Sequence, residues 1–128
     1  MGLPVVHFEI IGSTPDKLRD YYGSLFDWQF STGDAISEKV SQPGNYHFVD
    51  GSTTGDGDGI NGGVCGGEGF EHRVLFYVGV PDVEEALSKA ESLGGQRLLG
   101  PEPKSGEFTV GQFIDPEGNV VGVAGPSA

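Results

Sequence analysis

The chain is organised around a short stretch near its N-terminus, which reads Val5-Val6-His7-Phe8-Glu9-Ile10-Ile11. Apolar and polar residues alternate here with a period of two, which is typical of a β-strand with one buried face. Phe8 then lies on one face, and His7 and Glu9 lie on the other. A histidine and a carboxylate are costly to bury unless each finds a partner. We therefore expect this strand to form the wall of a binding cleft.

A helix is expected directly after this strand. Thr14 is a suitable N-cap and Pro15 suits the first helical position. Apolar residues then recur at helical spacing, namely Leu18, Tyr21, Tyr22, Leu25 and Phe26. Further strands are predicted from Trp28, over residues 36–40 and over residues 46–49. Nine of the nineteen residues 51–69 are glycine, so we expect a flexible connector there without a packed strand.

The second half of the chain repeats this order. A strand is predicted over residues 72–80, a helix capped by Asp82 and Glu85, a short strand over 96–99, and a hairpin of residues 108–114 and 119–124. The pattern predicts one α+β domain over residues 1–128. Module one spans about 1–50, the connector about 51–69 and module two about 70–128. Each module is βαβββ, and we expect the two to pair around a cleft with their helices outside.

Composition narrows the classes of function. The net charge of −12 disfavours nucleic acid and anionic membrane surfaces, which both need a basic patch, and it suits a cationic ligand. No apolar run approaches the ~20 residues of a membrane span, and no signal peptide is evident. Cys65 is the single cysteine, so no intrachain disulfide can form and the cytoplasm is the expected location.

Several segments of this sequence resemble the vicinal oxygen chelate superfamily, which comprises glyoxalase I, bleomycin-resistance proteins and extradiol dioxygenases. The resemblance is carried by His7-Phe8-Glu9-Ile10, Tyr21-Tyr22-Gly23-Ser24-Leu25-Phe26-Asp27-Trp28, Val80-Pro81-Asp82-Val83-Glu84-Glu85-Ala86, Leu93-Gly94-Gly95 and Asp115-Pro116-Glu117-Gly118-Asn119. It implies the paired βαβββ fold, a small-molecule cleft and a homodimer. It does not decide between the metalloenzymes and the metal-free binding proteins that share this scaffold.

The resemblance also implies where a metal ion would bind. His7 falls on the first-strand ligand position, and His47 is the strongest ligand type on the strand over residues 46–49. The matching positions of the second half are Leu75 and Gly122, whose side chains cannot coordinate a metal. The set is therefore at most half present. His7, His47 and Glu9 remain as a smaller two-histidine, one-carboxylate site for a divalent ion such as Fe, Zn, Ni or Mn.

The sequence thus favours a metal-free protein that binds a small organic molecule. The proposed ligand-binding residues are His7, Glu9, His47, Arg73, Leu75 and Tyr77. Arg73 is expected to face Glu9, either pairing with it or leaving it to bind a cationic group. The alternatives are a metal-dependent lyase, isomerase or dioxygenase with an unusual ligand set, and a non-catalytic accessory or regulatory module.

Overall fold

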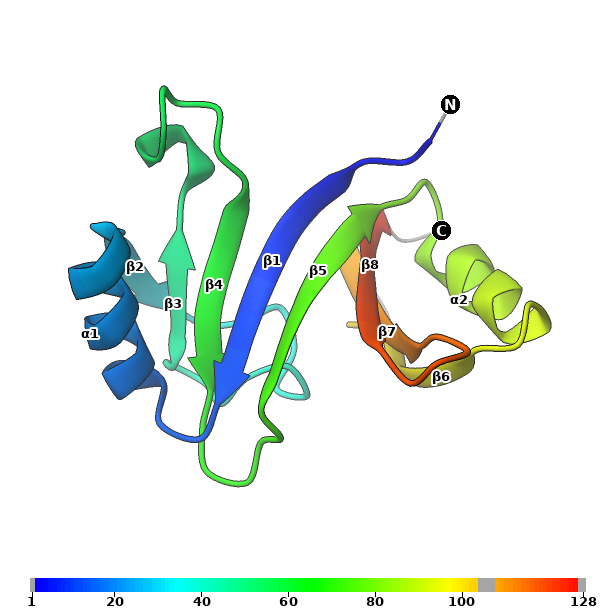
Figure 1. Ribbon diagram of the computed structural model, residues 1–128. Helices are drawn as coiled ribbons and strands as arrows, with labels where there is room; N and C mark the ends of the chain where they lie inside the picture. The colour runs from blue at the N-terminus through cyan, green and yellow to red at the C-terminus, as the bar shows by residue number, and fades with distance from the viewer. Residues whose placement is uncertain (1, 104–107, 127–128) are drawn as a thin grey trace. The chain divides into compact units, whose positions relative to one another are not determined.

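The computed structural model describes residues 2–103 and 108–126. In chain order the elements are β1 (Val5–Gly12), α1 (Pro15–Phe26), β2 (Phe30–Gly33), β3 (Tyr46–Val49), the 3-10 turn η1 (Gly51–Thr53), β4 (Asn61–Gly66), β5 (Arg73–Gly79), α2 (Val83–Ser92), β6 (Gln96–Glu102), β7 (Phe108–Ile114) and β8 (Val120–Pro126). This order is βαβββ written twice, as the sequence predicts (Figure 1).

The chain divides into two compact units. The N-terminal unit comprises His7–Val74, and the C-terminal unit comprises Leu75–Ala128 together with Met1–Val6. In the N-terminal unit the strand order is β2-β3-β4-β1, with β1 and β4 parallel and the other pairs antiparallel. In the C-terminal unit the order is β5-β8-β7-β6, with β5 and β8 parallel and the rest antiparallel. Each unit thus has one helix and four strands.

The prediction of a flexible connector over residues 51–69 is wrong. Residues 61–66 form β4, which is buried over most of its length and lies between β1 and β3. Its glycines are needed for packing, because a side chain at Gly62 would overlap the Phe8 ring and one at Gly63 would overlap the Tyr46 ring. Glycine here permits the close approach of aromatic rings to a central strand, and does not indicate a linker.

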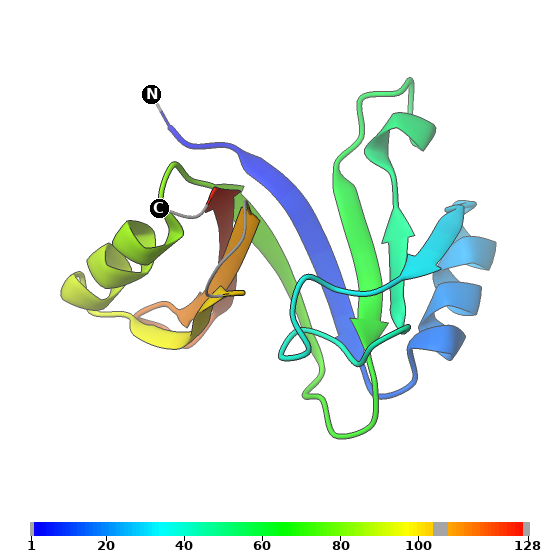
Figure 2. The ribbon, with the colours of Figure 1, turned by 180° about the vertical axis from the view of Figure 1, so that it is seen from behind.

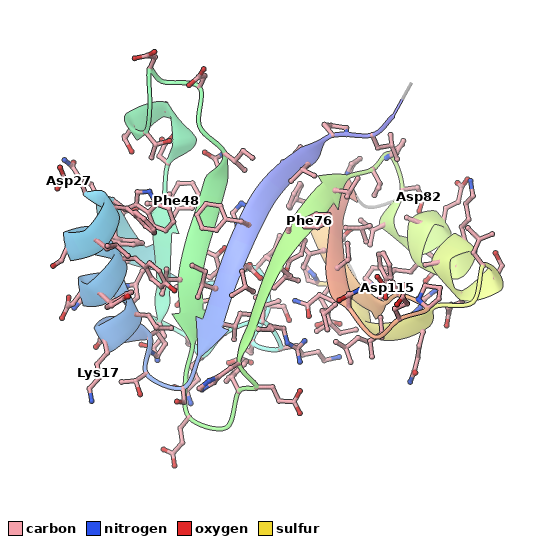
Figure 3. All side chains as sticks on the ribbon, in the orientation of Figure 1. Lys17, Asp27, Phe48, Phe76, Asp82 and Asp115 are labelled. Carbon is pink, nitrogen blue, oxygen red and sulfur yellow. The ribbon has the colours of Figure 1, made fainter. Side chains whose placement is uncertain are left out.

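The predicted strand over residues 36–40 is absent, since the described segment between β2 and β3 runs as bends and turns (Figure 2). Asp34 accepts a hydrogen bond from the Gly44 backbone N–H at 2.6 Å and closes this loop. Thr14 is the N-cap residue of α1 and Pro15 begins the helix, as predicted, but the Thr14 side chain makes no capping hydrogen bond. Asp82 does cap α2, accepting from the Glu85 N–H at 3.0 Å (Figure 3).

Each helix covers one face of its own sheet. In the C-terminal unit Val80, Val83, Leu87 and Val123 form a buried apolar cluster that packs α2 against the sheet. On α1 the predicted apolar stripe is only partly buried, and Tyr21, Leu25 and Phe26 remain more than half exposed. An aromatic cluster on the α1 side contains Phe8, Tyr22, Phe26, Trp28 and Phe30. The opposite face of each sheet is left for the side chains described next.

Candidate functional site

Three polar side chains of the N-terminal unit form a continuous hydrogen-bonded chain. Tyr46 on β3 donates its hydroxyl proton to Oε2 of Glu9 on β1, at 2.9 Å. The Tyr46 oxygen also lies 2.6 Å from Nε2 of His7. The Tyr46 ring spans β4 at Gly63, the position that has no side chain. The first strand therefore keeps its histidine and carboxylate on one face, and Tyr46 joins them.

The direction of these bonds assigns the form of the imidazole. A phenol has one proton, and here Tyr46 donates it to Glu9, so Nε2 of His7 must donate to the Tyr46 oxygen. In neutral imidazole the other ring nitrogen, Nδ1, is then an acceptor. Burial lowers the pKa of His7 below its usual value, which favours this neutral form. His7 is thus a neutral base held in one tautomer.

Aromatic and sulfur groups surround this chain on the same face. Phe48 and Tyr46 both stack on the His7 ring, each with centroids 6.4 Å apart. Phe48 is labelled in Figure 3, on β3. Cys65 is fully buried, and desolvation together with the nearby Glu9 carboxylate raises the pKa of its thiol. Cys65 is therefore a protonated packing group, and its environment is opposite to that of a nucleophilic cysteine.

His47 does not join His7 and Glu9. It follows Tyr46 on β3, so its side chain points to the opposite face of the sheet, toward α1. There Nδ1 lies 2.8 Å from the Thr32 hydroxyl and Nε2 lies 2.9 Å from an Asp16 carboxylate oxygen, which fixes the ring between β2 and α1. The three-residue site of His7, His47 and Glu9 is not assembled, because alternation along β3 separates the two histidines.

Arg73 begins β5 in the same unit. Its guanidinium forms an ion pair with Glu71 at 3.3 Å, and about a fifth of its side chain is exposed. Glu9, for which Arg73 is a candidate partner, accepts the hydrogen bond from Tyr46 described above. The sequence did not indicate this contact with Tyr46, because Tyr46 lies 37 residues away from Glu9 along the chain.

The C-terminal unit contains a similar arrangement built from neutral groups. Leu75 and Tyr77 are buried on β5, and Gln112 on β7 donates to the Tyr77 hydroxyl oxygen at 2.8 Å. The Tyr77 ring spans β8 at Gly122, where any side chain would overlap it. In both units a tyrosine thus crosses a glycine of the middle strand to reach a polar group on the far strand.

The residues at the four implied ligand positions can be compared with what a bound metal ion would need. Of the four implied positions, Leu75 has a hydrocarbon side chain and Gly122 has none, and the space above Gly122 is filled by the Tyr77 ring. His47 lies on the helix side of its sheet. Within residues 2–103 and 108–126, no group of three or more His, Cys, Asp or Glu is placed to hold an ion. The residues present do not fit the ligand set.

Sequence reasoning missed Tyr46 and Gln112. Tyr46 is not among the expected ligand-binding residues, although it is the central link of the polar chain. One signal could have found it: Gly62 and Gly63 stand consecutively in a segment that also contains Val64 and Cys65. Consecutive glycines beside apolar residues are typical of a strand approached closely by large side chains. No comparable signal points to Gln112.

Comparisons with known proteins identify the family and agree with the fold. The family model of the Glyoxalase/Bleomycin resistance protein/Dioxygenase superfamily matches residues 5–123. No curated protein matches the chain. Within the described residues, no helix is long and apolar enough to cross a membrane.

Solved structures resemble the chain at low sequence identity. A Streptomyces coelicolor methylmalonyl-CoA epimerase variant in complex with 2-nitronate-propionyl-CoA is 13% identical, with a TM-score of 0.67, covering 99% of this chain and 100% of that one. A hypothetical protein from Bacillus halodurans C-125 is 18% identical, with a TM-score of 0.63 and coverage of 100% and 97%. A Legionella pneumophila protein described as an NAD-dependent benzaldehyde dehydrogenase is 14% identical, with a TM-score of 0.60 and coverage of 94% and 98%. At these identities the likeness shows the fold alone.

Proposed function

This chain belongs to the Glyoxalase/Bleomycin resistance protein/Dioxygenase superfamily, and on that premise we propose that it binds a small organic molecule without a metal ion. The binding surface is the face of the N-terminal sheet that carries His7, Tyr46, Phe48 and Glu9, here called the polar face. The proposal rests on the site's chemistry, since superfamily membership is compatible with several activities.

One observation carries the metal-free part of the proposal. The Tyr77 ring lies across Gly122, at a position where the superfamily resemblance implies a ligating side chain. The Tyr77 hydroxyl accepts a hydrogen bond from Gln112, so the ring is held there by a buried polar contact. A glutamate at position 122 would require this packing to be rebuilt, and Leu75 on β5 adds no donor atom.

The polar face favours a ligand that donates hydrogen bonds and carries positive charge. His7 supplies an imidazole to this face, within hydrogen-bond distance of the Tyr46 hydroxyl. Phe48, which stacks on His7, supplies an aromatic surface of the kind that attracts cations. The Glu9 carboxylate lies behind Tyr46, and the whole chain has a net charge of −12. A small aromatic or aliphatic amine fits these features better than an anion does.

Three probes of matched shape test this proposal: benzylamine, benzyl alcohol and benzoate. We expect benzylamine, the cation, to bind most tightly and benzoate, the anion, most weakly. Two-dimensional NMR of the backbone amides and the His7 ring measures the binding. Trp28 would be a weaker reporter, because it packs among Phe8, Tyr22 and Phe30 on the α1 side of the sheet.

His7→Gln should weaken benzylamine binding by about tenfold, since a lost hydrogen bond to a charged group is worth roughly 1.5–3 kcal/mol. The matched control is His72→Gln, because His72 is exposed and lies just before β5. Equal affinity for the three probes, or shifts confined to residues away from the polar face, would contradict the proposal. No binding by any of the three would favour an accessory or regulatory module.

A second candidate function is proton transfer at carbon, as in an isomerase. The observation that favours it is the neutral, desolvated His7, whose tautomer is fixed by Tyr46. Such a base can remove a proton from an activated C–H group. The likeness to a methylmalonyl-CoA epimerase suggests acyl thioesters as substrates to assay. Exchange of the substrate's α-proton with deuterated water, lost in His7→Gln, would establish this activity over simple binding.

We further propose that the protein works in the cytoplasm and as a homodimer. The single cysteine, buried and with a raised thiol pKa, suits a reducing compartment. Homodimers are what the superfamily resemblance implies. Light scattering coupled to size-exclusion chromatography would test the oligomeric state, and a monomeric mass at micromolar concentration would contradict it.

A further inference from the structure

A pocket of about 530 Å³ lies in the N-terminal unit, away from the polar face. It is formed where β1 ends, α1 begins and β5 begins, and its lining residues are Ile10, Ile11, Gly12, Ser13, Thr14, Lys17, Leu18, His72, Arg73 and Val74. Pockets that bind small molecules are commonly about 300–1,000 Å³. The volume is therefore adequate for a ligand of modest size.

The charge of this pocket is opposite to that of the protein. The chain has only seven Lys and Arg residues against nineteen Asp and Glu, yet Lys17 and Arg73 both line the pocket, together with His72. None of the ten lining residues, all of them within the described ranges, is acidic. Charged residues distributed at random over such a surface would be mostly acidic, so a cationic lining points to an anion. Arg73 also pairs at 3.3 Å with Glu71, which is not one of the lining residues, so Lys17 carries most of this preference.

The backbone and hydroxyl groups at the pocket add to this preference. The first turn of α1 adjoins it, and the Thr14 side chain makes no capping hydrogen bond. Lys17 lies in the same turn, at the end of α1 nearest the tip of β1 (Figure 3). Helix N-termini favour negative charge. The Ser13 hydroxyl lies 3.3 Å from Nε2 of His72 and joins two lining residues.

The remaining wall is apolar, with Ile10, Ile11, Leu18 and Val74 among its residues. A bare inorganic ion would leave this surface in contact with water, whereas an organic anion would bury it. Each buried CH₂ group contributes about 0.8 kcal/mol, so a short alkyl chain would add substantially to the attraction of the cations. The cationic and the apolar lining residues together therefore favour a ligand with an anionic head and an apolar body.

We propose that this pocket binds a small organic anion, whose carboxylate or phosphate head lies at Lys17 and Arg73 and whose apolar body lies against Ile10 and Leu18. The site is separate from the polar face, which favours a cation. The proposal does not depend on the function proposed above.

Four probes with the same six-carbon chain test it by backbone-amide NMR: hexanoate, hexyl phosphate, hexan-1-ol and hexylamine. We expect the two anions to bind and to shift the amides of Ser13 and Asp16, and the alcohol and amine to bind at least tenfold more weakly. Hexanoate against hexyl phosphate identifies the preferred head group. Equal affinity for the alcohol and the anions would overturn the proposal.

One substitution should weaken hexanoate binding and another should strengthen it. Lys17→Gln should weaken hexanoate binding about tenfold, while Lys89→Gln on α2 is the matched control and should leave it unchanged. Glu71→Gln removes the carboxylate that pairs with Arg73 at 3.3 Å, and should tighten hexanoate binding two- to threefold. Unchanged affinity in both Lys17→Gln and Glu71→Gln would overturn the proposal. Benzylamine binding at His7 should be unaffected in these variants, which separates failure here from failure of the proposed function.

Discussion

In each unit a tyrosine ring packs across a glycine of the neighbouring strand, but the polar groups that the tyrosine hydroxyl contacts differ between the units. In the N-terminal unit Tyr46 crosses Gly63 and reaches the carboxylate of Glu9, and His7 donates to the same hydroxyl. In the C-terminal unit Tyr77 crosses Gly122 and meets the amide of Gln112. The first arrangement contains an imidazole and a carboxyl group, whereas the second joins a phenol to an uncharged amide. The ligand binding proposed above therefore concerns the N-terminal unit, where the imidazole and the carboxyl group lie.

The glycines at the crossing points should give the largest effects. Gly63→Ala and Gly122→Ala each place a methyl group into a tyrosine ring, and we expect each to lower the free energy of unfolding by about 1–3 kcal/mol, as overpacking usually does. Urea denaturation measures this. Gly33→Ala on β2 is the control, because nothing lies within 4 Å of its added methyl group. Wild-type stability in either crossing variant would contradict the packing shared by the two units.

The tyrosine hydroxyls should separate the two units. Tyr46→Phe removes a donor from a carboxylate, so we expect a loss of about 1.5–3 kcal/mol at neutral pH, whereas Tyr77→Phe removes an acceptor from a neutral amide and should cost about 0.5–1.5 kcal/mol. Chemical denaturation of both variants under one set of conditions gives the comparison. Equal losses would indicate that the carboxylate makes no difference to the polar face.

The pH dependence of stability should come partly from His7. Because burial lowers its pKa in the folded state, the unfolded chain binds more protons in the window just below the unperturbed value of about 6.5. Stability should therefore fall as pH falls through this window. His7→Gln should flatten that slope, and Gly33→Ala, which changes no ionisable group, should leave it intact. A slope that survives His7→Gln would show that other groups cause it.

The smallest expected effect concerns Cys65, whose thiol is buried and has a raised pKa. Iodoacetamide at pH 8 should label it only at the rate at which the protein unfolds, and should label it quickly in 8 M urea. Mass spectrometry follows the modification. Rapid labelling of the native protein would mean that this side of the polar face opens readily, and would reduce the contrast with the closed packing around Tyr77.

The strand–helix start of each module and the strand order of the second module were predictable because they rest on local signals. Alternation over residues 5–11, the Pro-Asp helix starts and the turn over residues 115–118 each act within a few residues of sequence. β4 was not predictable in the same way, because its glycines look like a linker until the rings of Phe8 and Tyr46 are placed against them. The contact between Glu9 and Tyr46 was missed for the same reason. A contact across 37 residues leaves no periodic pattern.

The prediction that the metal set is incomplete depended on residue types alone, and the packing of Tyr77 over Gly122 now gives it a physical basis. The smaller site of His7, His47 and Glu9 failed on alternation, since consecutive residues of β3 point to opposite faces. Tyr46 occupies the place beside His7 and Glu9 that His47 was expected to take. Which side chains lie together on one face depends on the strand register, and residue types alone do not determine it.

The central claim is that the His7, Tyr46 and Glu9 chain acts without the superfamily's metal. The most direct test is the metal content of protein purified without chelator, measured by inductively coupled plasma mass spectrometry for wild type and His7→Ala. The account predicts far less than one equivalent of any transition metal per chain, and the same value in His7→Ala. One tightly held equivalent in the wild type that is lost in His7→Ala would contradict it.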